Sequence, residues 1–549
     1  MNQTYRNKVL LIDDAFLLEV HNLQRKVNQA VKHPEPVMRL DAPWDNPTEC
    51  FTQLNVLYDG DEKTFKMWYA LLAPADQWSA NSSKWAYATS QDGIHWERPL
   101  LERIEHNGSK DNNYFTPPLD GFFGSIIIDP SDIASRRYKM LFQGNATDWA
   151  SFHVPVCLAY SADGIVWDRP THVNPVLRGL SDGLFVFYYD RDRRKYVLVT
   201  RRVPNLPRDV SQYESYDLVN WEDKGRILVP GDDLDPPSLF NLQAFAPFIY
   251  EDMYLGMVDV HYSLPGAETY EAYNKPPADF PDQRMGLIEF QLAYSRDGQQ
   301  WQRTRDRSAV VPVGGSDDPD AGIIFAPLSA PFTVNGETYL YYTASRPRHS
   351  VWDYSKFVEE CKRKKDYRGL CCGMLAKMPE DHWVSLDAGS EEGWCLAKPY
   401  ATPSQLLVNA DAEGGSIEAE FLTPYGQPVE GFTRADCIGI SGSGKDQEIK
   451  WKTSTNPRDL NEKYRGGLCL KFHLKNAKLY SYSLMEPDPD GSIKRYWDSA
   501  RWNEGILHRS DDWGRASNEP AGGLPQAPGT QRASGTRFGP NPRADAKWS

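Results

Sequence analysis

Apolar runs and alternating apolar and polar positions recur along the first two thirds of the chain, and they predict many short strands. Each unit begins with an apolar run, passes an acidic turn and ends in an alternating run with aromatic residues. The five units are NVLYDGDEKTFKMWYAL, SIIIDPSDIASRRYKMLFQG, LFVFYYDRDRRKYVLVTRR, FAPFIYEDMYLGMVDV and APFTVNGETYLYYTAS. Alternation at period two is typical of half-buried strands, so each unit predicts two paired strands.

A second phrase follows each unit and reads, at its clearest, Ser-x-Asp-Gly-x-x-Trp. The copies are ATSQDGIHWERP, AYSADGIVWDRP, YESYDLVNWED, AYSRDGQQWQRT and the degenerate GMLAKMPEDHWVSLD. Their tryptophans are Trp96, Trp167, Trp221, Trp301 and Trp383, spaced 54 to 82 residues apart. The phrase predicts a strand, a tight turn and an outer strand. Because the acids of the phrase recur, we interpret Asp92, Asp163, Asp217 and Asp297 as turn formers.

Four strands in each of five units predict an all-β fold, a five-bladed β-propeller followed by an antiparallel β-sandwich. A β-sandwich in place of the propeller is the alternative, but it does not explain five copies of one phrase. The expected domains are N-terminal strands over 1–40 that pack on the sandwich or propeller, the propeller over 41–393, the sandwich over 394–486 and a mostly disordered tail over 487–549. One helix is predicted, in SVWDYSKFVEECKRKKDYRG.

Charge and composition exclude some classes of binding partner. The chain has 75 acidic and 61 basic side chains, and its net charge of −14 opposes binding to nucleic acid or to an anionic membrane. It contains no apolar stretch of about 20 residues and no segment resembling a signal peptide, so we expect a cytoplasmic protein, or an exported one if a leader was removed. The eight cysteines lack metal-ligand spacing, which favours buried free thiols over disulfides or zinc. Oligomeric state is not indicated.

The Ser-x-Asp-Gly-x-x-Trp phrase, its five copies and the trailing sandwich resemble the five-bladed propeller glycoside hydrolases, the clan of families 32, 43 and 117. The segments Trp44-Asp45-Asn46-Pro47 and Glu49-Cys50 echo motifs of family 32, whereas its Arg-Asp-Pro motif is absent. The resemblance implies a carbohydrate substrate and catalysis by carboxylates. It does not define the sugar.

Residues just before the innermost strand of each blade are expected to gather at one mouth of the central channel. They include the acids Asp45, Glu49, Asp120 and Asp182. Cleavage of a glycosidic bond needs one carboxylic acid and one carboxylate. By the resemblance, Glu49 or Asp45 is the base or nucleophile, Asp120 the stabiliser and Asp182 the acid, with Glu289 as the other candidate acid. Capping of turns is the alternative role for each.

Other side chains at the ends of strands are candidates for substrate binding. They are His261, His349, Arg201, Asp320, Trp44 and Gln243. Arginine and histidine donate hydrogen bonds to sugar hydroxyls or to a carboxylate, and tryptophan stacks on a sugar ring. Each of these side chains also has a structural alternative, such as a solvated charge or a residue of the blade core.

The sequence therefore predicts a glycoside hydrolase that cleaves an oligosaccharide or glycoside by acid and base catalysis. A carbohydrate-binding propeller without catalysis and a phosphorylase or transglycosylase on the same scaffold are the alternatives, because fold alone does not establish chemistry. No cofactor and no catalytic metal are expected, although a structural calcium is compatible with the sequence.

Overall fold

The computed structural model describes most of the chain up to residue 494. The described residues are 7–72, 83–115, 124–144, 154–180, 185–201, 208–236, 239–251, 253–262, 284, 286–325, 327–349, 351–367, 370–400, 402–487 and 493–494. Most of the tail predicted from residue 487 lies outside them. No described helix is long and apolar enough to cross a membrane.

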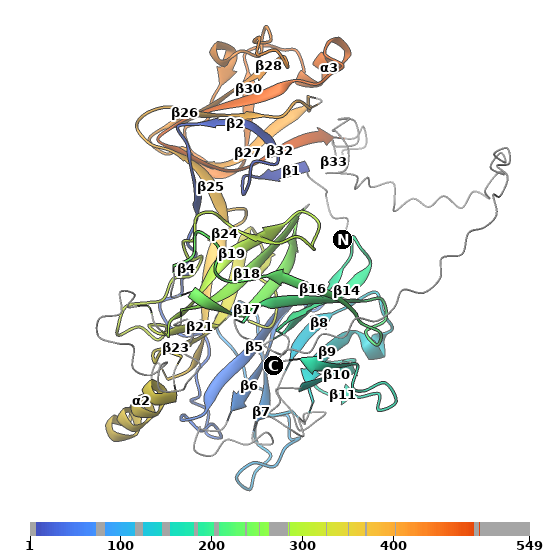
Figure 1. Ribbon diagram of the computed structural model, residues 1–549, viewed down its shortest axis with the longest axis vertical. Helices are drawn as coiled ribbons and strands as arrows, with labels where there is room; N and C mark the ends of the chain where they lie inside the picture. Colours follow the sequence, from blue (N-terminus) through green and yellow to red (C-terminus); the bar gives the residue numbers. More distant parts are fainter. Residues whose placement is uncertain are drawn as a thin grey trace, which may run out of the picture. The chain divides into compact units, whose positions relative to one another are not determined.

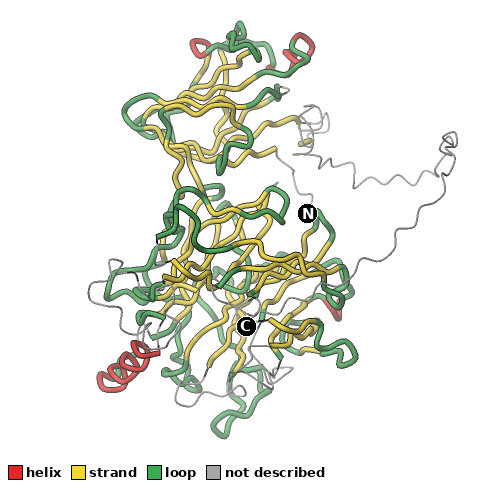
Figure 2. The backbone as a smooth tube through the Cα atoms, viewed as in Figure 1, coloured by secondary structure: helices red, strands yellow, loops and turns green. Residues whose placement is uncertain are grey.

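Strands dominate the fold, and the first group forms the five predicted blades (Figures 1 and 2). Blade 1 contains β5 (Cys50–Asp59), β6 (Thr64–Leu72) and β7 (Lys84–Ser90). Blade 2 contains β8 (Ser125–Ile128), β9 (Tyr138–Gln143), β10 (Val154–Ser161) and β11 (Trp167–Asp168), with β12 (Leu177–Leu180) beside β10. Blade 3 contains β13 (Val186–Asp190), β14 (Lys195–Thr200), β15 (Val210–Ser215) and β16 (Glu222–Leu228).

The last two blades share one extended sheet. Blade 4 contains β17 (Leu239–Tyr250), β18 (Met253–Tyr262), β19 (Ile288–Ser295) and β20 (Gln302–Arg303). Blade 5 contains β21 (Ile323–Phe325), β22 (Phe332–Val334), β23 (Glu337–Ser345) and β24 (Cys372–Pro379). Its outer strand is β4 (Val31–Lys32), which pairs with β24. An N-terminal segment thus completes the final blade, and the all-β propeller fold expected from the repeats is confirmed.

Two further antiparallel sheets form the C-terminal part. The larger contains β1 (Asn7–Leu10), β3 (Gln24–Val27), β25 (Val384–Ala388), β27 (Gln405–Asp411), β29 (Cys437–Ile438), β30 (Ser443–Trp451), β32 (Ala477–Pro487) and β33 (Ile493–Lys494). The smaller contains β2 (Leu17–His21), β26 (Gly393–Ala397), β28 (Ser416–Leu422) and β31 (Cys469–Lys475). Buried Phe472 and Tyr482 pack together between the sheets, as in a β-sandwich.

The degenerate fifth phrase behaves differently from the other four. Its first strand is β24, but the strand after Trp383 is β25, which pairs with β3 and β32 of the larger C-terminal sheet. Trp383 is buried against Phe248 of blade 4. The predicted helix is α2 (Val351–Lys364), between β23 and β24. Short helical turns occur at Ala134–Arg136, Arg434–Asp436, Pro457–Asp459 and, as α3, Leu460–Lys463.

The Ser-x-Asp-Gly turns have the structural role predicted for them. In blade 2, Ser161 Oγ accepts hydrogen bonds from the amides of Asp163 and Gly164, at 3.2 and 2.8 Å. Asp163 Oδ1 accepts hydrogen bonds from the amides of Ile165 and Val166, each at 2.8 Å. Gly164 has a φ of +77°, and a Cβ there would meet the Trp68 ring at 2.7 Å. The turn therefore needs glycine for its backbone and for its contact with the preceding blade.

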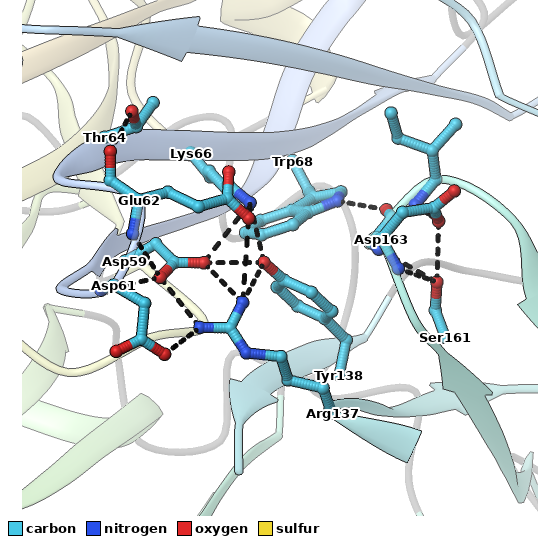
Figure 3. Close-up of polar contacts among 12 residues, drawn as sticks. Asp59, Asp61, Glu62, Thr64, Lys66, Trp68, Arg137, Tyr138, Ser161 and Asp163 are labelled. Carbon is cyan, nitrogen blue, oxygen red and sulfur yellow. Dashed lines mark hydrogen bonds and ion pairs between the residues drawn. The ribbon is translucent and has the colours of Figure 1, made fainter. Parts of the chain in front are cut away.

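An aspartate that ends or follows the innermost strand ties each of the first three blades to the next one. Figure 3 shows Asp59 of blade 1 surrounded by Arg137, Tyr138 and Lys66. Its carboxylate accepts two hydrogen bonds from Arg137 and one from Tyr138, all at 2.8 Å. The same pairing joins Asp129 to Tyr196 at 3.0 Å and Asp190 to Tyr254 at 2.8 Å. The aspartates of these acidic turns, Asp59, Asp129 and Asp190, thus link neighbouring blades, and we call them the aspartate clips.

Candidate functional site

Strand direction divides the propeller into two rims. Because neighbouring strands within a blade are antiparallel, the first and third strands begin at the rim where the second ends. We call this the mouth rim, and it is where β5, β8, β13, β17 and β21 begin. The opposite rim carries the Ser-x-Asp-Gly turns and the aspartate clips, and we call it the turn rim. The predicted site residues that the structure describes come from segments at the mouth rim.

Glu49 lies directly before β5, and its side chain is almost enclosed. It is 6% exposed, and its Oε1 pairs with Lys84 Nζ at 2.7 Å. Burial raises the pKa of Glu49 above its ordinary value, although Lys84 opposes the shift. Its Oε2 is buried without a hydrogen bond among the described residues.

Asp45 and Trp44 are held within blade 1. Asp45 Oδ2 accepts hydrogen bonds from Arg98 at 2.8 Å and from the Ala42 amide at 3.0 Å, and Oδ1 accepts from Tyr114 at 3.3 Å. Burial raises the pKa of Asp45. Trp44 Nε1 donates to Asn113 at 2.9 Å. These contacts fix the segment that positions Glu49.

A basic group forms where blades 3, 4 and 5 meet. Arg208 donates to Gln243 Oε1 at 2.7 Å, and Arg201 donates to the same oxygen at 3.4 Å. The ring of fully buried His261 packs edge-on against His349, with centroids 4.7 Å apart. Burial lowers the pKa of His261 well below its ordinary value, and His349 and the two arginines add to the shift. The structure thus brings together four of the predicted binding residues: Arg201, Gln243, His261 and His349.

Glu289 forms a second acidic position at the mouth rim, near the beginning of β19. Its Oε1 accepts a hydrogen bond from Tyr262 at 2.7 Å. Burial raises the pKa of Glu289, while Tyr262 and the nearby Arg284 oppose the shift. Arg284 lies over the Tyr262 ring at 4.4 Å. A carboxyl group with a raised pKa at a channel mouth is a candidate proton donor.

The remaining predicted residues are not among these contacts. Asp320 is buried in blade 5, where it pairs with Lys32 of β4 at 2.6 Å and accepts a hydrogen bond from Tyr342 at 2.9 Å. Those contacts are the ones expected of a structural acid. Asp120 and Asp182 lie outside the described residues.

Sequence reasoning missed the partners of these acids. Lys84 begins the third strand of blade 1, Arg208 lies just before the third strand of blade 3, and Tyr262 ends the second strand of blade 4. The prediction considered mainly residues before the first strand of each blade. The signal was present, because the start of each third strand is at the same rim as the start of each first strand. Lys84 and Arg208 lie at those positions.

One group of described carboxylates has the spacing of a metal site. Glu251, Glu380 and Asp381 lie together on the turn rim side of blades 4 and 5. Lys8 Nζ contacts all three, at 3.1, 3.0 and 2.9 Å. A buried ammonium therefore already contacts each of these carboxylates.

Comparisons with known proteins find a similar domain family and several similar solved structures. Residues 55–246 match the model of the glycosyl hydrolases family 32 N-terminal domain. The match covers most of blade 1, all of blades 2 and 3 and the beginning of β17 in blade 4, so the resemblance to propeller glycoside hydrolases predicted from the sequence is confirmed for this domain. A search of curated proteins finds no match.

Solved structures with a similar arrangement include several carbohydrate-active enzymes. The Bombyx mori family 32 β-fructofuranosidase is 13% identical, with 84% of this chain and 93% of that chain covered and a TM-score of 0.37. A fructofuranosidase from Schwanniomyces occidentalis complexed with fructose is 11% identical, with coverage of 83% and 98% and a TM-score of 0.38. A β-1,2-mannobiose phosphorylase from Listeria innocua is 12% identical, with coverage of 64% and 96% and a TM-score of 0.41.

Proposed function

We propose that this protein hydrolyses glycosidic bonds in an oligosaccharide or glycoside, using carboxyl groups at the mouth rim as acid and base. The observation that carries the proposal is the pair of mouth-rim glutamates, buried Glu49 and partly buried Glu289, whose pKa values are both raised. A general acid must hold its proton at the working pH, and burial is the usual means. The family 32 domain match over residues 55–246 supports the same class of reaction.

The two glutamates differ in their partners, and the difference suggests their roles. Glu289 accepts one hydrogen bond from neutral Tyr262, so we assign it as the proton donor to the leaving oxygen. Glu49 is paired with the cation Lys84, which favours its ionised form, so we assign it as the base or nucleophile. Asp120 and Asp182 stay candidates for a stabilising carboxylate from blades 2 and 3.

The test compares Glu289→Gln and Glu49→Gln on a panel of aryl glycosides whose leaving groups differ in acidity. If Glu289 is the acid, its variant loses most activity on poor leaving groups and least on activated nitrophenyl glycosides. Glu49→Gln should lose about 100-fold or more on all of them. The matched control is Glu337→Gln on the turn rim, where the side chain is half exposed. Wild-type turnover by both glutamate variants would contradict the assignment.

The basic group at blades 3 to 5 supports a second candidate, phosphorolysis of the same kind of bond. Two arginine side chains converge on one neutral amide, Gln243, next to the His261–His349 pair, and such a group can receive an anion. Turnover that requires inorganic phosphate, yields a sugar phosphate and is lost in Arg208→Met would favour phosphorolysis. Glycan binding without turnover under either condition would favour a binding protein.

A further inference from the structure

Two of the eight cysteines lie close together. Cys50 Sγ and Cys371 Sγ are 3.4 Å apart, although the residues are 321 positions apart in the sequence. Both side chains are half-buried, while Cys157, Cys361, Cys372, Cys395, Cys437 and Cys469 are buried. The Cys50–Cys371 pair is therefore close enough to react and open enough for a small reagent to reach.

The pair lies where the propeller ring closes. Cys50 is the first residue of β5 in blade 1, and Cys371 directly precedes β24 in blade 5. The two strands approach closely at Gly373, where a Cβ would lie 3.3 Å from the Phe51 ring. Phe51 belongs to an apolar cluster that also contains Tyr341 and Leu375 of blade 5. The cysteines thus flank the packed contact between the first blade and the last.

We propose that Cys50 and Cys371 form a reversible disulfide that fastens blade 1 to blade 5. The bonded sulfur atoms of a disulfide are about 2.05 Å apart, so the two atoms must approach by roughly 1.4 Å. A low-molecular-weight disulfide such as oxidised glutathione is the oxidant. One thiolate attacks it and releases one glutathione thiol, and the second thiolate attacks the mixed disulfide and releases another. Two protein thiols are oxidised to one disulfide, and one glutathione disulfide is reduced to two thiols.

The position gives the bond two consequences. Separation of blade 1 from blade 5 opens the ring, so a covalent link across this seam resists unfolding of the propeller. The link also connects the residue after Glu49 to the segment that follows α2, and both belong to the mouth rim. Oxidation therefore restrains the surroundings of Glu49 together with the ring seam.

The test counts thiols in the denatured protein after incubation of the folded protein in glutathione buffers of increasing oxidised fraction. Wild type should fall from eight thiols to six, and mass spectrometry of unreduced peptides should join Cys50 to Cys371. Cys50→Ser and Cys371→Ser should keep all seven of their thiols. The matched control Cys157→Ser should lose two and keep five. Eight thiols in oxidised wild type, or a link from Cys371 to its neighbour Cys372, would overturn the proposal.

Thermal unfolding provides the second measurement. Oxidised wild type should unfold several degrees above the reduced protein, and dithiothreitol should remove the difference. The two serine variants should show no dependence on the glutathione ratio. If oxidised protein with six thiols has the same midpoint of thermal unfolding as the reduced protein, the proposed stabilising link between blades 1 and 5 is wrong. Neither readout depends on catalysis, so the result is independent of the proposed hydrolysis.

Discussion

The two rims of the propeller bury acids in opposite ways. On the turn rim, Asp59 is enclosed by Arg137, Tyr138 and Lys66, and these donors hold its pKa well below the usual range in spite of burial. On the mouth rim, Glu49 and Glu289 each have one side-chain donor among the described residues, and burial raises their pKa values. Buried carboxylates with a full set of donors stabilise the fold, whereas those with few donors are available for proton transfer.

The largest expected effect is a loss of folding stability on the turn rim, caused by Asp59→Asn. The change leaves Lys66 and Arg137, both largely buried, without their central counter-charge between blades 1 and 2. We expect a loss of about 3 to 5 kcal/mol in the free energy of unfolding, measured by urea denaturation. Asp61→Asn is the control, because Asp61 contacts the same Arg137 but its side chain is 77% exposed. Its loss should stay below about 1 kcal/mol.

The pH dependence of stability sharpens this comparison. Because the folded pKa of Asp59 is lowered, its contribution is complete above the unfolded value of about 4 and is lost as the pH falls further. Asp59→Asn should therefore be closer to wild type in stability at pH 3 than at pH 7. An equal difference at both pH values would contradict the role of the charged carboxylate.

The next effect concerns the repeated turn. Gly164→Ala forces a side chain onto a residue with a φ of +77° and against the Trp68 ring. We expect a loss of about 2 kcal/mol by the same denaturation measurement, since the left-handed conformation alone costs about 1 to 2 kcal/mol. Gly60→Ala is the control, because nothing lies within 4 Å of a Cβ there. Similar losses in both variants would show that the turn tolerates a side chain.

The smallest effect is on the mouth rim, for Tyr262→Phe. The hydroxyl of Tyr262 donates to Glu289 and lowers its pKa, so its removal should raise that pKa. If Glu289 is the proton donor, activity falls as the pH rises through its pKa, and the variant should show this fall at higher pH. A hydrogen bond of about 1 kcal/mol corresponds to roughly 0.7 pH unit in the profile of kcat/KM.

Tyr342→Phe provides the control for that measurement. Tyr342 donates to Asp320 in blade 5 in the same way, but Asp320 is paired with Lys32. Its removal should leave the alkaline side of the pH profile unchanged. Equal shifts in the two variants would argue against Glu289 as the group that titrates.

The sequence predicted the blades well because each blade repeats its own local pattern. The four clear phrases form turns whose hydrogen bonds join neighbouring residues, so short-range chemistry defines them. The fifth phrase lacks that turn, and the strand after Trp383 pairs with β3 and β32 instead. Such pairing depends on segments hundreds of residues away, which a local pattern does not reveal.

The candidate site was predictable in position but not in its contacts. The described residues before the first strands lie at one rim, since connectivity alone decides that. The ion pairs of Glu49 with Lys84 and of Asp320 with Lys32 depend on which strands become neighbours in space. Asp320 and Glu49 both precede a first strand in the sequence, and each has a lysine partner that the sequence does not reveal.

The pairing of β4 with β24 has a consequence for how the chain acquires its fold. Val31 pairs with Lys377 and Lys32 pairs with Ala376. During synthesis, these pairs can form only after the ribosome has made nearly the whole propeller. During that time, blade 1 has no neighbour on one side and β4 has no partner. The ring is completed in a late step that joins the earliest and latest segments of the propeller.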